Sequence, residues 1–281
     1  MVKLQTIVDI KPSTWKIGYE DRILMVGSCF SDEIGEQMQQ RYLNVSCNPF
    51  GTLYNPLSIA QALTMTEMPE LVEHEGLWHS MAHHGSFSRA NKNEAIEAVR
   101  ASIDTMQKAI EEATIVIVTF GTSWVYEKDG TIVGNCHKLP ESCFTRRRLS
   151  VEEIVEAWKP ILERYSDKKW LFTVSPIRHI KDGLHENQLS KATLLQAVEE
   201  LKNREYRLQN TDRISYLPSY EIMLDELRDY RFYADDLVHP SSLAVNYIWE
   251  RFVDTFCTNQ TKNELVLQHK RWKHEHHISL H

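Results

Sequence analysis

The feature that most restricts the fold is the run Thr114-Ile-Val-Ile-Val-Thr-Phe120, which is β-branched almost throughout and apolar at both alternating sets of positions. A strand with one face in water alternates apolar and polar residues, whereas a strand covered by helices on both faces stays apolar. Residues 114–120 therefore predict a central strand of a parallel sheet.

Further strand patterns alternate with helical ones along the chain. Strands are predicted at residues 23–26, 169–174 and 213–217, and helices at 31–42, 93–113, 150–165, 187–201, 219–227 and 241–256. The helix at 150–165 opens with a capping box, Ser150-x-x-Glu153, and we expect Pro160 to kink or end it. This βαβα order predicts an α/β fold, a three-layer α/β/α sandwich with a mostly parallel, flavodoxin-like sheet.

A length of 281 residues allows one large domain or two small ones, since a domain averages about 150 residues. No long linker interrupts the pattern, so we expect a single domain over residues 1–257. Residues 51–84 are interpreted as an insertion or lid, and an Asp-Gly turn at 129–130 predicts an inserted hairpin. Residues 258–281 are polar and are expected to form a loosely ordered tail.

The formal net charge of −7 argues against a general binder of nucleic acid or of anionic membranes. No apolar run reaches the roughly 18 residues that a membrane span requires, and the first 13 residues lack the apolar core of a signal peptide. We therefore expect a cytoplasmic protein. Five widely spaced cysteines without a C-x-x-C pair favour neither a disulfide framework nor structural zinc.

A candidate nucleophile follows the first predicted strand, where Gly27-Ser28-Cys29-Phe30 precedes a helix. Ligands of open α/β sheets bind at the carboxyl ends of strands, and a helix N-terminus offers backbone N–H groups and positive potential. That potential favours a thiolate at Cys29, whereas Ser28 needs a base to remove its proton. The alternative is a glycine turn beside a buried cysteine.

A candidate base lies near the other end of the chain, in Asp236-Leu-Val-His239, directly before the last core helix. A carboxylate three residues before a histidine can orient the ring and leave its other nitrogen free to accept a proton. The alternative is a helix cap beside a surface histidine. Each segment alone is a weak signal, but together they supply a nucleophile and a base.

With these two segments the sequence resembles the GSCFA family, a branch of the SGNH/GDSL hydrolase superfamily. The first segment matches the motif that names the family, with Ser31 in place of its final alanine. Other stretches that resemble the family are residues 48–56, 121–126, 175–179, 227–233 and 236–240, so the resemblance spans roughly residues 23–256.

The resemblance implies roles for individual residues. In the superfamily the first motif is Gly-Asp-Ser, so the nucleophile position falls on Cys29, although a shift of one residue would select Ser28. The family pattern further implies that the N–H of Gly51 stabilises an oxyanion, and that Ser123 stands where the superfamily has an asparagine donor. Asn48 and Asn55 are alternative donors, and the sequence does not choose between them.

Several other polar residues are candidates for substrate contact. His79, His83 and His84 share a short stretch, and His84 is expected to lie on a substrate-facing loop. No carboxylate or cysteine lies at ligand spacing from them, so we predict no metal and no cofactor. Arg178 and His179 follow a strand end and are candidates for contact with an anionic or sugar substrate, with surface hydrogen bonding as the alternative.

These observations favour a hydrolase or acyltransferase acting on a small-molecule or carbohydrate ester, with an acetyl-like group and a carbohydrate-like alcohol implied by the resemblance. The altered Gly-Ser-Cys motif and the missing asparagine favour an alternative, a non-catalytic binding module on the same scaffold. A histidine-dependent metallohydrolase is a third hypothesis. The sequence leaves the oligomeric state open.

Overall fold

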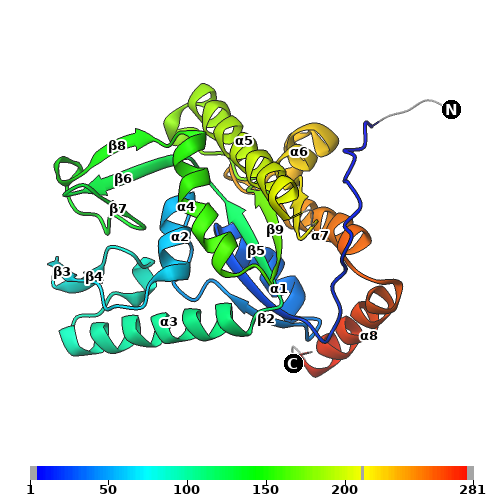
Figure 1. The fold of residues 1–281 in the computed structure, drawn as a ribbon, viewed down its shortest axis with the longest axis horizontal. Coiled ribbons are helices and arrows are strands. Elements are labelled where there is room, and N and C mark those ends of the chain that lie inside the picture. The colour runs from blue at the N-terminus through cyan, green and yellow to red at the C-terminus, as the bar shows by residue number, and fades with distance from the viewer. Residues whose placement is uncertain (1–4, 210–211, 277–281) are drawn as a thin grey trace.

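The fold is built on a parallel five-stranded sheet, seen in a computed structural model that describes residues 5–209 and 212–276 (Figure 1). The order is β10-β9-β5-β1-β2, and every neighbouring pair is parallel. The strands are β1 (Arg22–Gly27), β2 (Asn44–Cys47), β5 (Ile115–Phe120), β9 (Lys169–Val174) and β10 (Ile214–Leu217). As the sequence predicts, β5 is central, and all six of its residues are buried.

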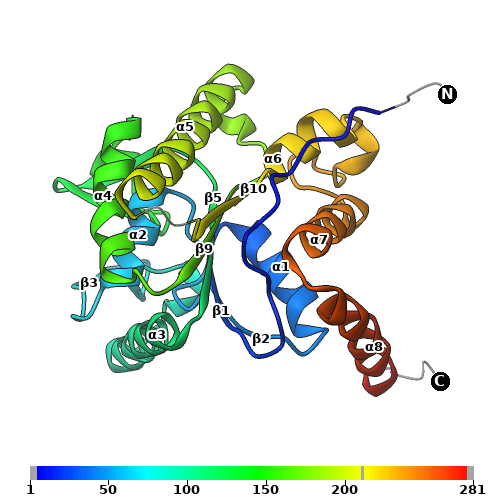
Figure 2. The same cartoon turned by 45° about the vertical axis from the view of Figure 1, so that its right-hand side comes forward.

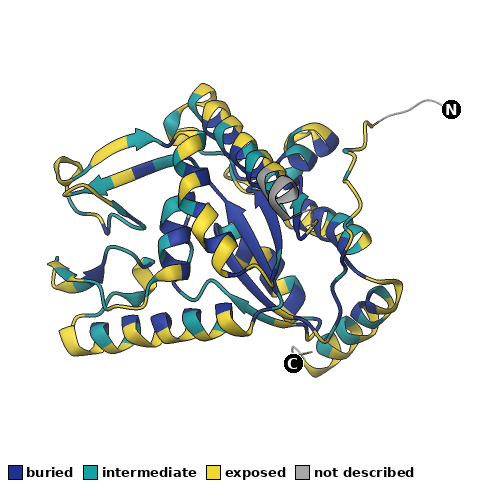
Figure 3. Cartoon of the chain, in the orientation of Figure 1, coloured by how far each residue is buried: buried dark blue, intermediate teal, exposed yellow. Residues whose placement is uncertain are grey.

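Helices cover both faces of this sheet (Figure 2). One face packs against α1 (Cys29–Gln39), η4 (Ile222–Leu227) and α7 (Ser242–Phe256), and the other against α2 (Pro56–Thr64), α3 (Lys92–Glu112), α4 (Val151–Arg164) and α5 (Leu184–Gln209). The short α6 (Ser219–Glu221) precedes η4, and its Tyr220 packs into the core on the second of these faces. Alternate strand residues enter the two cores, so that Val116 and Val118 face one and Ile115 and Ile117 the other. The dark sheet in Figure 3 shows this two-sided burial. The predicted three-layer α/β/α sandwich is confirmed.

Polar side chains cap the N-termini of three helices. Ser150 and Glu153 form the predicted capping box of α4. The side chains of Asn55 and Ser241 cap α2 and α7 by accepting backbone N–H groups of the first turn. Pro160 lies inside α4, which continues to Arg164, so the proline does not end this helix.

Two antiparallel additions extend from the sandwich on the same side (Figure 1). One pairs β3 (Leu71–His74) with β4 (Leu77–Ser80), and the other has the order β7-β6-β8. The predicted hairpin is formed by β6 (Trp124–Lys128) and β7 (Thr131–Val133), joined at Asp129 and Gly130. The third strand, β8 (Thr145–Arg148), was not predicted. The remaining turns are η1 (Gly85–Phe87), η2 (Glu141–Cys143), η3 (Ile180–Asp182), the π-helical η4 (Ile222–Leu227) and η5 (Tyr230–Phe232).

Two expectations differ from the structure. Residues 51–84 are not merely an insertion, because α2 lies within the core and buries Ile59 and Leu63. The segment after Thr258 is not a loose tail as far as it is described, because it forms α8 (Asn259–Glu275). Leu265 of α8 is buried, and His269 lies 2.9 Å from a guanidinium nitrogen of Arg41. Residues 277–281 of the expected tail lie outside the described residues.

An extended N-terminal arm precedes β1 and lies against the C-terminal elements (Figure 1). Glu226 accepts the Val8 N–H at 2.8 Å, and the Ile17 N–H donates to the Phe256 carbonyl at 2.7 Å. Thr261 of α8 donates to the Ile17 carbonyl at 3.0 Å. The arm therefore joins the two ends of the described chain.

Candidate active site

The candidate site begins at a tight turn after β1. Gly27 has φ +140°, and a Cβ added there would lie 2.2 Å from the Thr119 carbonyl oxygen of β5. Only glycine adopts this backbone region without strain. The N–H of Gly27 donates to Asn48 Oδ1 at 2.8 Å, and that of Ser28 donates to the Thr119 carbonyl at 3.2 Å. These bonds fix the direction in which the chain enters α1.

Ser28 and Cys29 occupy different environments at this turn. Ser28 is the N-cap of α1, but its Oγ is buried and makes no hydrogen bond among the described residues. Cys29 is the first residue of the helix and is partly exposed. Of the two candidate nucleophiles, Cys29 is therefore the one that a ligand in solvent can reach.

The helix start does not by itself activate Cys29. Burial raises the pKa of its thiol, and the carboxylates of Asp32 and Glu33 raise it further. The backbone N–H groups of Cys29 and Phe30 act in the opposite direction without cancelling this. The expectation that the helix N-terminus favours a resting thiolate is therefore not met, and a nucleophilic Cys29 needs a base.

Asp236 and His239 form the pair that their spacing predicts. His239 Nδ1 lies 2.6 Å from Asp236 Oδ2, and Asp236 Oδ1 accepts the N–H groups of Val238 and His239 at 2.9 and 3.0 Å. These hydrogen bonds, led by the one from the His239 backbone, lower the pKa of Asp236 to about 2. The His239 side chain is half exposed, so a ligand in solvent can reach the ring.

Cys29 and His239 both interact electrostatically with one side chain, the carboxyl of Glu33. Cys29, Glu33 and Gln37 are spaced four residues apart and share one side of α1. Gln37 donates to Asn246 of α7 at 3.0 Å, and the charge of His239 acts on the carboxyl of Glu33, whose pKa is raised mainly by burial. The face of α1 that carries Cys29 is thus turned toward the start of α7, where His239 lies.

The loop after β9 holds the histidine segment in place. The N–H of Arg178 donates to the Val238 carbonyl, and its guanidinium donates to that of Leu237, both at 3.1 Å. The guanidinium also lies 5.2 Å from the ring centre of Tyr233. Arg178 therefore connects the end of β9 with the loop that carries Asp236 and His239.

His179, the next residue, lines the same region. Its ring meets that of Tyr54 edge to face at 6.5 Å, and its Nε2 is buried without a hydrogen bond among the described residues. Burial and the positive charge of Lys191 lower the pKa of His179 to about 4. The imidazole of His179 is thus held neutral beside Tyr54, with Nε2 buried.

The candidate oxyanion donors already have partners inside the protein. The N–H of Gly51 donates to the Asn48 carbonyl at 2.7 Å, and the Asn48 amide donates to Asp32 at 2.7 Å. Asn55 caps α2, and Ser123 donates to Ser190 Oγ at 3.1 Å. In this structure these four residues support the loops around Cys29.

His84 and its neighbouring histidines are part of the scaffold beside these loops. A Cβ on Gly51 would lie 2.3 Å from that of His84, so the two backbones approach closely. His83 is fully buried between the hydroxyls of Ser80 and Ser102, at 2.7 and 2.8 Å. Within residues 5–209 and 212–276 no group of three potential ligands is placed to hold a metal ion.

Sequence reasoning missed one face of α5. Asn187 accepts the His179 N–H at 2.9 Å, and Ser190 accepts the N–H of Ser123 at 2.8 Å. Lys191 donates to the carbonyls of Gly121 and Ser175, both at 2.7 Å. Their spacing could have identified them, because Asn187, Ser190 and Lys191 lie on the same side of the helix as the buried Leu194, Val198 and Leu201.

A model of the GSCFA family matches residues 22–252. The chain belongs to the GSCFA family. The match includes the Gly27 turn, the loops after β5 and β9, and the Asp236–His239 pair, which are the segments that meet at the candidate site of this GSCFA protein. No curated protein matches the chain.

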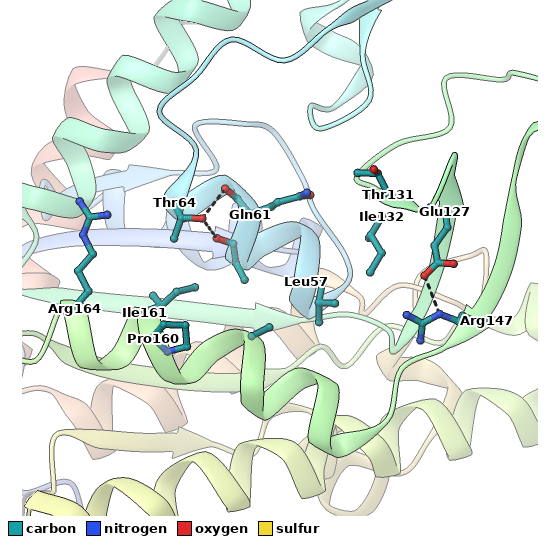
Figure 4. Close-up of a pocket in the computed structure, with 13 residues that line it drawn as sticks. Leu57, Gln61, Thr64, Glu127, Thr131, Ile132, Arg147, Pro160, Ile161 and Arg164 are labelled. Carbon is teal, nitrogen blue, oxygen red and sulfur yellow. Dashed lines mark hydrogen bonds and ion pairs between the residues drawn. The ribbon is translucent and has the colours of Figure 1, made fainter.

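A separate cavity of about 640 Å3 lies between α2, α4 and the β6–β7 hairpin (Figure 4). Its rim carries the Glu127–Arg147 ion pair at 2.8 Å, and its walls include Leu57 and Ile161. None of the predicted site residues lines it. No helix of the GSCFA protein, in the part of the chain that the structure describes, is both long and apolar enough to traverse a bilayer.

Proposed function

We propose that this GSCFA protein is an acyl-transfer enzyme of the SGNH/GDSL type, a hydrolase or acyltransferase that uses Cys29, His239 and Asp236. The observation that carries the proposal is the Asp236–His239 pair at 2.6 Å, on the sheet edge where a partly exposed Cys29 begins α1. A histidine oriented by a carboxylate and facing a nucleophile is the arrangement that acyl transfer requires.

The proposed reaction begins with a neutral thiol, in agreement with the raised pKa of Cys29. His239 Nε2 takes the thiol proton while the sulfur bonds to the ester carbonyl carbon, and the carbonyl electron pair moves to oxygen. When the carbon–oxygen bond to the alcohol breaks, His239 returns the proton to the leaving oxygen. Water, or an acceptor alcohol, then attacks the thioester by the same steps and regenerates the thiol.

The oxyanion is assigned first to the backbone N–H groups at the start of α1, those of Cys29 and Phe30. Gly51 and Ser123 belong to the proposal as further donors, whose present hydrogen bonds exchange when an ester binds. Asn48 and Asn55 hold the loops that carry them. Arg178, His179 and His84 are proposed to line the alcohol side of the substrate, with Arg178 also fixing His239.

The substrate proposed from the family resemblance is a small acyl ester, such as acetyl, of a carbohydrate-like alcohol. The test is hydrolysis of p-nitrophenyl acetate and of a panel of acetylated sugars by Cys29→Ala, Ser28→Ala and His239→Ala. Loss of a general base costs about 10²- to 10⁴-fold, so we expect Cys29→Ala and His239→Ala to lose at least about 100-fold. Ser28→Ala is expected to retain activity.

Two exposed residues supply matched controls, Cys143→Ala for the thiol and His185→Ala for the imidazole. Both are expected to behave as the unmodified protein does. Mass spectrometry after reaction with p-nitrophenyl acetate at low pH should find the acetyl group on Cys29. Unchanged turnover by His239→Ala would contradict the proposed mechanism.

One observation favours a second candidate, a non-catalytic binding module. The pKa of the Cys29 thiol is raised, and the candidate donors at Gly51 and Ser123 already form hydrogen bonds within the protein. Under this hypothesis no ester is turned over, yet acetylated sugars raise the melting temperature. That rise would be smaller in Arg178→Ala and His179→Ala.

A further inference from the structure

Arg178, at the end of β9, is a cation without a carboxylate partner. A guanidinium carries five N–H donors, and this one donates from Nη1 to the Leu237 carbonyl at 3.1 Å. No carboxylate within residues 5–209 and 212–276 lies at ion-pair distance from it, and the side chain is only partly buried. Its remaining N–H donors therefore have no partner among the described residues.

The carboxylates of the adjoining loop do not balance this charge. Asp229 lies 3.8 Å from the guanidinium of Arg231, and Asp236 lies 2.6 Å from the ring of His239. Asp235 is exposed and forms no ion pair with any residue that the structure describes. A positive charge thus remains at the end of β9 without a carboxylate in contact with it.

Two tyrosine rings border the guanidinium. Its central carbon lies 5.2 Å from the ring centre of Tyr233 and 5.9 Å from that of Tyr230. The rings themselves are 6.0 Å apart and tilted by 46°. Tyr230 is 65% exposed, and in the described part of the chain neither phenol hydroxyl has a hydrogen-bond partner. We call these two rings and the guanidinium of Arg178 the tyrosine platform.

The tyrosine platform is joined to the segment that carries the candidate base. Tyr233 pairs with Pro240 in an antiparallel bridge, and the N–H of Ala234 donates to the His239 carbonyl at 2.8 Å. Together with the bond from Arg178 to Leu237, these contacts fix the platform beside the Asp236–His239 turn. A ligand held near His239 can therefore extend onto it.

The chemistry of the platform fits a sugar with an anionic group. The C–H groups on one face of a sugar ring pack on an aromatic ring, and sugar hydroxyls exchange hydrogen bonds with phenols and guanidinium groups. Two rings tilted by 46° form no parallel slot for a flat base. A guanidinium with unused donors binds a carboxylate or a phosphate through two parallel hydrogen bonds.

We propose that Arg178, Tyr230 and Tyr233 form a subsite for an anionic sugar, in which the rings carry the sugar face and the guanidinium binds its carboxylate or phosphate group. This inference rests on the proposed function and deepens it, because it names the class of alcohol that the ester contains. The platform binds the alcohol portion and takes no part in moving protons.

The test is binding of unacylated sugars, which acyl transfer cannot consume. Titration calorimetry on the unmodified protein gives dissociation constants for D-glucuronate, D-glucose 6-phosphate and D-glucose. We expect at least one anionic sugar to bind about fivefold more tightly than glucose, which is the upper range for one exposed charge pair. Comparison of glucuronate with glucose 6-phosphate tells a carboxylate ligand from a phosphate ligand. Equal affinity for all three sugars would overturn the proposal.

The charge is tested by Arg178→Gln, which keeps hydrogen-bond donors and removes the guanidinium. The preference for the anionic sugar should fall below about twofold. Arg231→Gln is the matched control, since it removes a guanidinium from the same loop, and its preference should equal that of the unmodified protein. An equal loss in both variants would show that a diffuse positive field selects the anion, and the role of Arg178 would be wrong.

The rings are tested by Tyr230→Ala, which should weaken all three sugars by about threefold and leave the preference for the anion in place. Tyr126→Ala removes a partly exposed ring from the β6–β7 hairpin and should bind all three as the unmodified protein does. Unchanged affinities in Tyr230→Ala would contradict the platform.

A further measurement covers the case in which Arg178→Gln fails to fold. In the unmodified protein, raising sodium chloride from about 0.05 M to about 0.5 M should weaken binding of the anionic sugar and leave that of glucose unchanged, because salt screens an exposed charge pair. An anion preference that is the same at both salt concentrations would refute the charge contact.

Turnover separates this inference from the proposed reaction. If Cys29→Ala and His239→Ala leave ester turnover unchanged while the anionic sugar binds as expected, the reaction fails and the subsite stands. If both variants lose turnover while the unmodified protein shows no preference for an anionic sugar, the subsite alone is refuted.

Discussion

Replacement of Gly27 by alanine tests whether the turn after β1 depends on the missing side chain. The added Cβ would lie 2.2 Å from the Thr119 carbonyl oxygen and 2.9 Å from two further backbone atoms of Thr119, where no real Cβ is found. Because these are backbone atoms of the central strand, β1 must separate from β5 at this point. The perturbation therefore affects the sheet edge that carries Ser28 and Cys29.

The magnitude follows from two contributions. Alanine at φ +140° costs about 1–3 kcal/mol in backbone strain. Loss of the bond between the Ser28 N–H and the Thr119 carbonyl, at 3.2 Å, costs about 1 kcal/mol more. We expect a loss of about 2–4 kcal/mol, which in a chain of this length lowers Tm by about 4–8 °C.

The assay is thermal unfolding followed by circular dichroism, with Gly130→Ala as the matched control. Gly130 also has a positive φ, of +76°, but an added Cβ meets nothing within 4 Å. Gly130→Ala therefore introduces only backbone strain, which should lower the free energy of unfolding by about 1 kcal/mol and Tm by about 2 °C. If Gly27→Ala lowers Tm no more than Gly130→Ala does, crowding against Thr119 is not what requires a glycine.

Three further outcomes are expected. Burial lowers the pKa of His83 from 6.5 to about 4, so the unfolded chain binds a proton at this residue at a higher pH than the folded protein does. The free energy of unfolding should therefore drop by about 3 kcal/mol between pH 6.5 and pH 4. The pH dependence of the free energy of unfolding should be weaker in His83→Gln. Glu226→Ala leaves the partly buried Arg251 without its carboxylate and should cost about 3–5 kcal/mol in denaturant unfolding, against less than about 1 kcal/mol for the exposed Glu199→Ala, whose partner is Lys202. Ser150→Ala removes the cap of α4 and should cost about 1 kcal/mol in the same assay, with Ser150→Thr close to the unmodified protein; equal losses in both would argue against the cap.

The sequence predicted those parts of the fold in which side-chain pattern and backbone environment agree. The central strand β5 was recognisable because it is apolar on both faces, and α4 because a capping box precedes an apolar stripe. The strand β8 was not recognisable in the sequence, because three of its four residues are arginines. It is stabilised by contacts that no local pattern reveals, such as the guanidinium of Arg146 at 4.4 Å from the ring of Trp124.

For the site, spacing alone predicted the contact between Asp236 and His239, since both lie in one turn. The order of the segments predicted that this pair and the Gly27 turn belong to one sheet edge. The state of Cys29 could not be predicted, because its pKa depends on how deeply α1 is buried and on carboxylates of the next turn. Lys191 was not predicted as a site residue, because its hydrogen-bond acceptors are carbonyls of Gly121 and Ser175 in loops far from it in the sequence.

The N-terminal arm bears on the order in which this chain can fold during synthesis. The Val8 amide and the Glu226 carboxylate are 218 positions apart, and Ile17 and Thr261 are 244 apart. At a synthesis rate of about 5–20 residues per second, the arm is made about 10–50 s before the residues that it contacts. Contacts of such separation also form late because closing a long loop is entropically expensive. Until α7 and α8 are synthesised the arm lacks these partners and stays in solvent, and these two helices complete its packing.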